Sequence, residues 1–398
     1  MVTLIGMGSG KWEALSEQAQ QAVRSAGLVF GAKRLLAGLP ADCTARQFAL
    51  YQPADILETL AQNPGQDAVV LYSGDTGFYS GASGLLTPLR ALGIPARVYP
   101  GVSSIQLLSA ALGRPWQDWK LVSAHGCACD PVAECMMNRS VFFLTGGTET
   151  PASLCQKLTD AGMGEAHGVV GENLGTEAET IRYGSAAELA GQSFAPLSVL
   201  LVENFDLPQL RAPGFPDESF IRSEVPMTKQ EVRAAALAKL AVMSTDTLWD
   251  VGAGTGSVSV ELALAAPKGR VYAVECEPDA CELIRKNRAK FHACNLILIE
   301  GRAPDVLADL PAPDAVFIGG TKGGMEAVLD EVLGKNPSAR ICISAIALET
   351  LGAAIAALTA RGLTAEVTQI AVSRTKPAGR LHLLMANNPI FLITGTRK

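Results

Sequence analysis

Short apolar runs alternate with amphipathic stretches along the first half of the chain. Each run ends in glycine or another turn signal: VTLIGMG (2–8), LVFG (28–31), DAVVLYSGD (67–75), ARVYPG (96–101), KLVSAHG (120–126) and SVFFLTG (140–146). Between them, the stretches 11–26 and 53–63 are helical in character. Strands that alternate with helices predict an α/β fold.

A second group of runs has less helix between its members. HGVVGENLG (167–175), ETIRYGS (179–185) and LSVLLVENF (197–205) follow one another closely, which predicts another small sheet. We therefore expect the first half to form two lobes, with the change from one lobe to the other near residues 148–151.

The alternation breaks after Asp206. The segment 206–231 holds four prolines and little periodicity, which is typical of a connection between domains. We predict a first domain over residues 1–207, a linker over 208–224 and a second domain over 225–398.

The second domain returns to alternating elements. Its predicted helices are 228–243, 257–266 and 278–291. Its predicted strands are 247–252, 270–275, 296–301, 314–320 and 339–345, followed by an antiparallel pair, 364–375 and 381–395. We expect a doubly wound parallel sheet with a hairpin at its edge.

Composition narrows the set of partners. Of the 398 residues, 48% are hydrophobic and 18% are charged, which suits large cores and argues against disorder. The net charge of −6 is opposite to the basic surface that nucleic acid needs. No run reaches the roughly 18 to 20 apolar residues that span a bilayer, and no signal-peptide pattern opens the sequence. We expect a cytoplasmic protein that binds neither nucleic acid nor membrane.

Nine cysteines are scattered through core-like segments, which suits reduced thiols rather than a disulfide framework. Cys127, Cys129 and Cys135 cluster with His125, and metal sites use such ligands. The usual C-x-x-C pairs are absent, so a thiol-rich loop after a strand is the simpler interpretation. We predict no metal site.

The segment DVGAGTGS (250–257) follows a predicted strand and opens a predicted helix. Ligands bind at such turns in doubly wound folds, where glycine lets the backbone approach them closely. The third glycine comes one residue too early for the dinucleotide fingerprint G-x-G-x-x-G. A tight turn alone would also explain the loop. The next strand ends at Glu275, whose carboxylate is placed either to accept hydrogen bonds from a ribose diol or to be solvated at the strand end.

This arrangement resembles the class I S-adenosylmethionine-dependent methyltransferases, whose first motif is an acid followed by G-x-G-x-G. The resemblance implies a Rossmann-like second domain in which Glu275 holds the ribose and Ala303 lies near the adenine. The residues that would cradle the amino-acid part of the cofactor are Gly252, Ala253, Gly254, Thr255 and Gly256.

Segments spread over residues 224–398 narrow this resemblance. Those segments are MTKQEVRAAALAKL, DVGAGTGSVSVELA, FIGGTKGG, ISAIALET and NNPIFLITG. Together they look like the decarboxylating precorrin methyltransferases of cobalamin biosynthesis. Thr228 matches a position that touches the cofactor in that family. Ser344 departs from it, because relatives usually carry asparagine there.

Three loops of small residues end strands of the first domain: IGMGSG (5–10), YSGDTGFYSG (72–81) and YPGVSSIQ (99–106). Such loops at one edge of a sheet frame a cleft. Ser103 and Ser104 offer hydroxyls beside a helix N-terminus, although plain helix capping explains them equally well.

These loops, with SAHG (123–126) and FFLTGG (142–147), resemble the tetrapyrrole methylase family from Val2 to about Asn204. That family has a two-lobed fold with S-adenosylmethionine in the cleft. The family's G-D-P motif departs at its third position, Thr76. The cofactor-site residues that the resemblance implies are Asp75, Ser103 and Ser104, with Gly77, Leu144 and Leu174 less directly.

Within that family the carbon-5 methylases of the cobalamin pathway are most similar. The two resemblances together imply two S-adenosylmethionine sites per chain. They imply methylation of a reduced corrin precursor at carbons 5 and 15, with loss of carbon dioxide from the acetate on carbon 12, giving precorrin-8X. The alternatives are a nicotinamide-dependent oxidoreductase and a regulator that binds tetrapyrrole or cofactor without turnover.

A tetrapyrrole carries many carboxylates, so cations should line the mouths of both clefts. The candidates for substrate binding are Arg233, Arg302, Lys322, Arg374, Lys376 and Arg380. A solvated surface charge is the alternative for each of them. The resemblance also suggests a homo-oligomer, a dimer or a tetramer.

Overall fold

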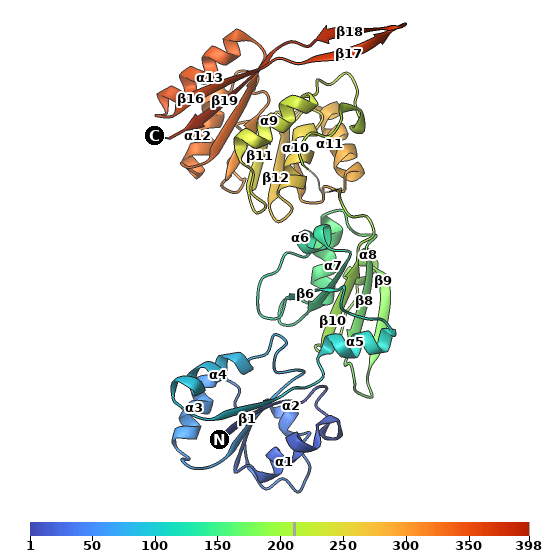
Figure 1. The fold of residues 1–398 in the computed structure, drawn as a ribbon, viewed down its shortest axis with the longest axis vertical. Helices are drawn as coiled ribbons and strands as arrows, with labels where there is room; N and C mark the ends of the chain where they lie inside the picture. Colours follow the sequence, from blue (N-terminus) through green and yellow to red (C-terminus); the bar gives the residue numbers. More distant parts are fainter. Residues whose placement is uncertain (210–211, 398) are drawn as a thin grey trace. The chain divides into compact units, whose positions relative to one another are not determined.

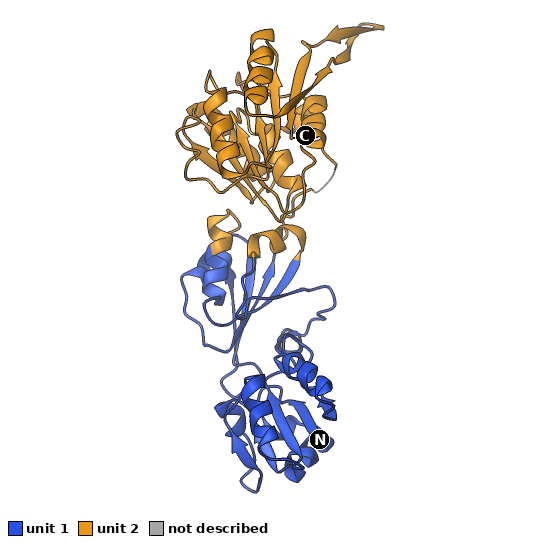
Figure 2. Cartoon of the chain, turned by 90° about the vertical axis from the view of Figure 1, so that its left-hand side faces the viewer, with its two compact units in different colours: residues 1–129, 140–156, 165–203 blue, residues 130–139, 157–164, 204–398 orange. Residues whose placement is uncertain are grey.

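The computed structural model describes residues 1–209 and 212–397. Residues 210 and 211, in the predicted linker, and Lys398 lie outside the described residues. The chain divides into two compact units (Figure 2). Unit 1 comprises residues 1–129, 140–156 and 165–203, and unit 2 comprises residues 130–139, 157–164 and 204–398.

The first sheet of unit 1 is parallel, with the strand order β3-β2-β4-β1-β5 (Figure 1). Its strands are β1 (Val2–Gly6), β2 (Leu28–Phe30), β3 (Arg46–Phe48), β4 (Ala68–Tyr72) and β5 (Ala96–Tyr99). The helices between them are α1 (Glu17–Ser25), α2 (Lys33–Leu36), α3 (Pro53–Ala61) and α4 (Ala82–Ala91). Leu4 packs into one hydrophobic cluster and Ile5 into another, because successive side chains of a strand point to opposite faces.

The second sheet of unit 1 is mixed, with the order β6-β7-β10-β8-β9. Its strands are β6 (Lys120–Ser123), β7 (Ser140–Leu144), β8 (His167–Glu172), β9 (Thr180–Ser185) and β10 (Ser198–Glu203). Only β6 and β7 run parallel among these described strands. The helices of this part of the chain are α5 (Ser104–Leu112), α6 (Pro131–Met137), α7 (Pro151–Asp160) and α8 (Ala186–Ala190).

The predicted change of lobe near residues 148–151 is wrong. β6 and β7, which precede that point, pair within the second sheet, so the change falls between β5 and β6. An apolar run that ends in glycine looks the same in either sheet, and periodicity does not tell which neighbour a strand will pair with. The predicted helix 11–26 is also shorter, because Ser16 caps α1 by accepting from the backbone N–H of Ala19.

Unit 2 is built on one sheet with the order β13-β12-β11-β14-β15-β19-β16. Its strands are β11 (Thr247–Val251), β12 (Arg270–Glu275), β13 (Leu296–Glu300), β14 (Ala315–Ile318), β15 (Arg340–Ala345), β16 (Thr364–Ile370) and β19 (Ile390–Thr396). Its further helices are α9 (Gln230–Leu240), α10 (Ser257–Ala265), α11 (Pro278–Lys290), α12 (Met325–Lys335) and α13 (Leu348–Ala360). The predicted doubly wound sheet is confirmed, with β11 at the point where the strand order reverses.

The end of the sheet differs from the predicted hairpin edge. β19 lies between β15 and β16 and pairs antiparallel with both. The chain between β16 and β19 forms a separate two-stranded ribbon of β17 (Ser373–Ala378) and β18 (Leu381–Ala386). Figure 1 shows this ribbon extending from the rest of unit 2.

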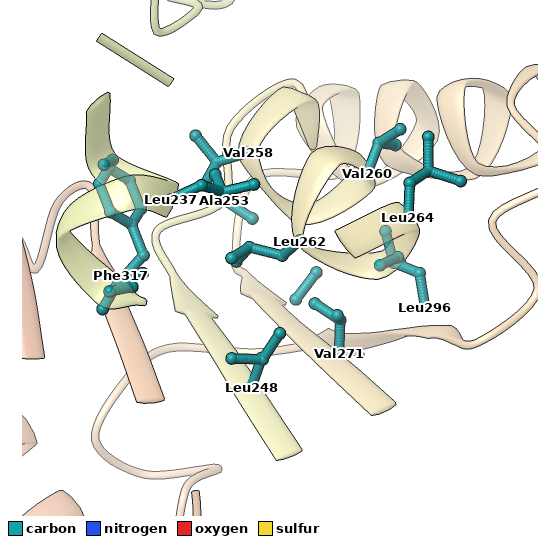
Figure 3. Close-up of a cluster of buried hydrophobic side chains, with 14 of the residues drawn as sticks. Leu237, Leu248, Ala253, Val258, Val260, Leu262, Leu264, Val271, Leu296 and Phe317 are labelled. Carbon is teal, nitrogen blue, oxygen red and sulfur yellow. The ribbon is translucent and has the colours of Figure 1, made fainter. Parts of the chain in front are cut away.

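One hydrophobic cluster of unit 2 lies between α10 and the sheet (Figure 3). Val258 and Leu262 of α10 pack in this cluster with Leu248, Val271 and Phe317 of the strands. This packing holds α10 on the sheet and so fixes the loop between β11 and α10. Among the described helices, none combines the length and apolar character needed to cross a membrane.

The second part of the predicted linker belongs to this core. Phe215 and Phe220 are buried in the same cluster as α10. The backbone N–H groups of Gly214 and Phe215 donate to the Glu261 carboxylate at 2.6 and 3.1 Å. Proline and weak periodicity correctly predicted irregular backbone here, but they gave no sign that a buried carboxylate would satisfy it.

Candidate functional site

A cavity of about 920 Å³ opens at the carboxyl edge of the unit 2 sheet. We call it the C-terminal cavity. The predicted cofactor residues that line it are Thr228, Gly252, Ala253, Gly254, Thr255, Glu275 and Ala303. Gly256 is not among its described lining residues; a Cβ there would lie 2.9 Å from Cγ1 of Ile284, so this glycine serves the packing of α10 against α11.

Gly252 is required by the turn that shapes this cavity. Its φ of +73° lies in the left-handed region, and a Cβ would come within 2.3 Å of the carbonyl oxygen of Gly320. Only glycine meets both conditions without strain. The backbone N–H groups of Gly252 and Ala253 both donate to the carbonyl of Val274, at 3.0 and 3.2 Å. The ends of β11, β12 and β14 are therefore held together at one point.

Glu275 ties the neighbouring strand to the same loop. Its Oε2 accepts from the backbone N–H of Gly254 at 2.8 Å, and its Oε1 accepts from those of Cys276 and Glu277 at 2.8 and 3.0 Å. A carboxylate has about four acceptor positions, so one remains for a ligand hydroxyl. The side chain lines the cavity while only 8% of the residue is exposed.

Two polar side chains beside the loop have atoms without a partner among the described residues. Asp250 is fully buried; its Oδ2 accepts from the Ser259 hydroxyl, whereas Oδ1 has no partner. Burial, and then the charge of Glu275, raise the pKa of Asp250 to about 7. Thr255 Oγ1 is buried, unpartnered and part of a residue that lines the cavity. Unsatisfied buried groups of this kind are uncommon and point to a ligand or water.

The mouth of the C-terminal cavity holds two of the predicted substrate cations, Arg302 and Lys322. Lys322 pairs with the carboxylate of Glu277, and this contact raises the pKa of Lys322 and lowers that of Glu277. Arg302 donates to the carbonyl oxygen of Lys322 at 3.4 Å. Ile346 lines the same cavity and is largely exposed.

The expectation for Arg233 is wrong. This residue is fully buried, with ion pairs to Asp217 at 2.9 Å and Glu261 at 2.8 Å, and it stacks over the ring of Phe220. The sequence did not indicate this structural role, because the acids that pair with Arg233 lie 16 and 28 residues away along the chain. Arg233 also donates to the carbonyl of Thr228 and so anchors the start of the cavity wall.

The other three predicted substrate cations lie on the β17–β18 ribbon and are not among the described residues of either cavity. They are Arg374, Lys376 and Arg380. Arg374 pairs with Glu231 at 2.7 Å and with Asp217 at 3.1 Å, and so fastens the base of the ribbon to the buried charges around Arg233.

A second cavity, of about 320 Å³, lies within unit 1. We call it the N-terminal cavity. The predicted residues that line it are Asp75, Ser103, Ser104, Leu144 and Leu174. They come from strand ends of both sheets and from the segments that follow those strands, so both sheets contribute to the cavity wall. Gly77 is outside the described lining, and its backbone N–H donates to Asp75 Oδ2 at 2.6 Å.

The three small-residue loops meet beside this cavity. A Cβ on Gly101 would lie 2.2 Å from the carbonyl oxygen of Gly74 and 2.5 Å from that of Gly6. Asp75 reinforces the crossing, since its Oδ1 accepts from the backbone N–H of Gly101 at 3.3 Å. The ends of β1, β4 and β5 therefore converge as closely as backbone allows.

Both interpretations of the serine pair have structural support. Ser103 is the N-cap residue of α5, and its backbone N–H donates to Gln106 Oε1 at 2.8 Å. Ser103 also lines the cavity, with Ser104 beside it. Capping and a place in the cavity wall are thus compatible, because the helix N-terminus itself points at the cavity edge.

Sequence reasoning missed most of the mouth of the N-terminal cavity. The exposed side chains of Arg34, Tyr79, Val102 and Leu197 line it. Arg34 follows the strand β2 closely, which was a usable signal. The sequence did not reveal that β2 lies beside β4, and this order brings Arg34 to the same edge as Asp75.

The thiol-rich loop after β6 contributes one residue to the N-terminal cavity. His125 lines the N-terminal cavity, with Nδ1 at 3.2 Å from the carbonyl oxygen of Thr145. Over residues 1–209 and 212–397, no group of three or more His, Cys, Asp or Glu side chains is placed to hold a metal ion.

Two family models match the chain. Residues 1–190 match the tetrapyrrole (corrin/porphyrin) methylases, and residues 219–397 match the precorrin methyltransferase domain. A solved structure, that of precorrin-6Y C5,15-methyltransferase from Geobacter metallireducens, is 38% identical with a TM-score of 0.46 and covers 48% of this chain and 100% of that chain.

Two curated relatives are also similar. The probable cobalt-precorrin-6B C(15)-methyltransferase (decarboxylating) of Pyrobaculum calidifontis is 46% identical over 187 residues, which is 46% of this chain and 95% of that protein. The precorrin-6Y C(5,15)-methyltransferase (decarboxylating) of Sinorhizobium sp is 32% identical over 338 residues, which is 83% of this chain and 81% of that protein. These matches confirm the predicted fold class and the predicted enzyme class, a methyltransferase with decarboxylation. The chain belongs to the family of decarboxylating precorrin-6Y C(5,15)-methyltransferases.

Proposed function

We propose that this chain methylates a reduced tetrapyrrole of the precorrin-6Y type at carbons 5 and 15, and removes carbon dioxide from its carbon-12 acetate, giving precorrin-8X in cobalamin biosynthesis. The N-terminal cavity serves carbon 5, and the C-terminal cavity serves carbon 15 and the decarboxylation. One observation carries this proposal. The motif residues of the first family line a cavity in unit 1, those of the second family line a cavity in unit 2, and both cavities are large enough for a small-molecule ligand.

The C-terminal cavity suits S-adenosylmethionine. The close approach of Gly252 to Gly320 opens a backbone cradle that a Cβ would fill. Thr255 Oγ1 is an unused hydrogen-bonding group at the cavity floor, and Glu275 retains acceptor capacity for a ribose hydroxyl. Thr228 and Ala303 complete the walls on which the amino-acid and adenine ends would lie.

The N-terminal cavity offers a second site for the same cofactor. Ser103 and Ser104 line it at the start of α5, and Leu144 and Leu174 supply an apolar wall. The role of Asp75 is then to fix the loop through Gly77 and Gly101 rather than to carry a charge to the ligand.

The mouths of the cavities suit a polyanionic macrocycle. Exposed apolar side chains, Ile346 at one mouth and Tyr79, Val102 and Leu197 at the other, offer surface to a flat ring system. Arg302 and Lys322 would bind its carboxylates at the C-terminal cavity. Lys322 would then exchange Glu277 for a substrate carboxylate.

Methyl transfer depends mainly on how the cavity positions the two reactants. S-adenosylmethionine supplies an electrophilic methyl group, and the meso carbon of a reduced tetrapyrrole is an enamine-like nucleophile. The cavity walls would hold the two in line, and such positioning can contribute about 7–11 kcal/mol in favourable cases. In the decarboxylation the C–C bond to the carboxylate breaks, its electron pair enters the ring system, carbon dioxide leaves, and the former methylene carbon takes up a proton. The cavity assists by removing water from that carboxylate.

We also propose that the chain assembles into a homo-oligomer. Strand β18 exposes Leu381, Leu383, Leu384 and Met385, at 48–70% of their surface. A lone two-stranded ribbon is marginally stable in water, and clustered exposed apolar side chains mark interfaces. Light scattering on wild type should give a multiple of the chain mass, and Leu381→Ser/Leu384→Ser should lower it. A monomeric wild type would contradict the proposal.

Mass spectrometry of the product tests the function. Full-length enzyme, S-adenosylmethionine and reduced precorrin-6 should give a product with two added methyl groups and one carbon dioxide lost. Gly252→Ala should leave only the single methyl addition of the N-terminal cavity. An unchanged substrate mass with the wild-type enzyme would overturn the tetrapyrrole assignment.

A further inference from the structure

Arg34 stands at the mouth of the N-terminal cavity without a described function. It belongs to α2, which follows β2, and β2 lies beside β4 in the sheet. Its guanidinium donates to the hydroxyl of Ser73, the residue directly after β4. Both residues line the cavity. The sheet order therefore places a cation and a hydroxyl side by side at the cavity edge.

Among the described ion pairs, none gives Arg34 a compensating negative charge. Asp75 is the carboxylate among the described lining residues. Its two oxygens accept from the backbone N–H groups of Gly77 and Gly101, and none of the described ion pairs joins it to Arg34. Arg34 is an exposed residue, but its neighbours remove part of the hydration of the guanidinium, and this partial desolvation lowers the pKa of Arg34. A partly desolvated charge without a counter-charge favours an anionic ligand.

We infer that Arg34 and Ser73 form a carboxylate-binding subsite of the N-terminal cavity. This inference rests on the proposed function, in which two ligands of the cavity carry carboxylates. One is the amino-acid end of S-adenosylmethionine, and the other is an acetate or propionate side chain of the tetrapyrrole. The guanidinium matches either, since its planar donors bind a carboxylate through two parallel hydrogen bonds.

Three variants test the subsite in the full chain. Arg34→Ala removes the cation, and Arg34→Lys keeps the charge but loses the paired donors. Lys33→Ala is the matched control, because Lys33 is an exposed cation one residue earlier on the same helix and is not among the described lining residues. For calorimetry, each of these three substitutions is combined with Gly252→Ala, which blocks cofactor binding in the C-terminal cavity. The heat measured then reports binding at the N-terminal cavity alone.

The probes separate the two carboxylate sources. S-adenosylhomocysteine carries the amino-acid carboxylate, whereas 5′-methylthioadenosine lacks it. If Arg34 binds the cofactor, Arg34→Ala weakens S-adenosylhomocysteine about 10- to 100-fold and leaves methylthioadenosine unchanged. If Arg34 binds the tetrapyrrole, both nucleosides bind as before, and KM for the tetrapyrrole rises by a similar factor with little change in kcat. In either case Arg34→Lys should fall between Arg34→Ala and the wild type.

The subsite is overturned if Arg34→Ala and Lys33→Ala match the wild type in both the calorimetric and the kinetic assay. That outcome differs from a failure of the proposed function, which would show as a wild-type enzyme that leaves the tetrapyrrole unmethylated.

Discussion

The two cavities serve one cofactor in our account, yet they are built on different foundations. The C-terminal cavity lies at the edge of a single doubly wound sheet, and buried charges lie beside it: Asp250, Glu275 and the network of Arg233, Asp217 and Glu261. The N-terminal cavity is framed by two sheets and depends on close backbone contacts among Gly6, Gly74 and Gly101.

This difference teaches that a ligand cradle can be fixed in two ways. A loop at a sheet edge can be tied by charge-assisted hydrogen bonds to buried carboxylates, as Glu275 ties Gly254. It can also be fixed by glycines that let chain segments touch, as Gly101 touches Gly6 and Gly74. Each cavity uses some of both, since Asp75 also ties Gly101 and Gly252 also approaches Gly320, but the emphasis differs. The first way makes the site sensitive to protonation and to loss of a charged partner, and the second makes it sensitive to any added side-chain atom.

The largest effect is expected from breaking the buried charges of unit 2. Arg233→Met nearly keeps the volume but leaves Glu261 without its cation and Asp217 with Arg374 as its remaining ion-pair partner among the described residues. It should lower the unfolding free energy of unit 2 by about 3–5 kcal/mol in denaturant titrations. Adding Asp217→Asn and Glu261→Gln should recover much of the loss. Arg302→Met, a cation at the cavity mouth, is the control and should change stability by less than about 0.5 kcal/mol.

Asp250 should make the stability of unit 2 depend on pH. Its pKa is about 7 in the folded chain and 3.8 as the ordinary value, so the folded state binds the proton more tightly. The favourable contribution is complete below pH 4 and is lost as the pH rises toward 7. Relative to Asp250→Asn, the wild type should lose about 1.4 kcal/mol of stability per pH unit across that window. Parallel pH curves for the two proteins would contradict this expectation.

The smallest effect concerns the helix start at the N-terminal cavity. Gln106→Ala removes the acceptor for the backbone N–H of Ser103, and losing such a cap costs about 1 kcal/mol. Affinity for S-adenosylhomocysteine at this cavity should fall several-fold, because Ser103 and Ser104 lose their fixed positions. Gln21→Ala on the exposed side of α1 is the control. Equal affinity in both variants would show that capping and ligand binding are independent.

The sequence predicted much of this arrangement. Periodicity and glycine placement identified the α/β architecture and the strand ends at which both cavities form, since ligand loops follow the carboxyl ends of strands. Motif resemblance supplied Thr228, Glu275 and Ala303, which the structure brings together at the C-terminal cavity.

What the sequence could not predict depends on which elements become neighbours. Arg34 was overlooked because the position of β2 beside β4 is a property of the sheet order and not of local pattern. Arg233 was predicted at the substrate site for a similar reason. Asp217 and Glu261 come close enough to pair with it only when the proline-rich segment packs against α10. The strand pairing of β6 and β7 is a third case, since nothing in a short apolar run specifies its sheet.

The central claim is that each unit holds its own cofactor site. Calorimetry and native mass spectrometry with S-adenosylhomocysteine test it most directly on the full chain, comparing wild type with Gly252→Ala and Gly101→Ala. Each variant places a Cβ within 2.3 Å of backbone oxygen at one cavity only. The account predicts two molecules bound per wild-type chain and one per chain in either single variant. One molecule per wild-type chain, lost in only one of the variants, would contradict it.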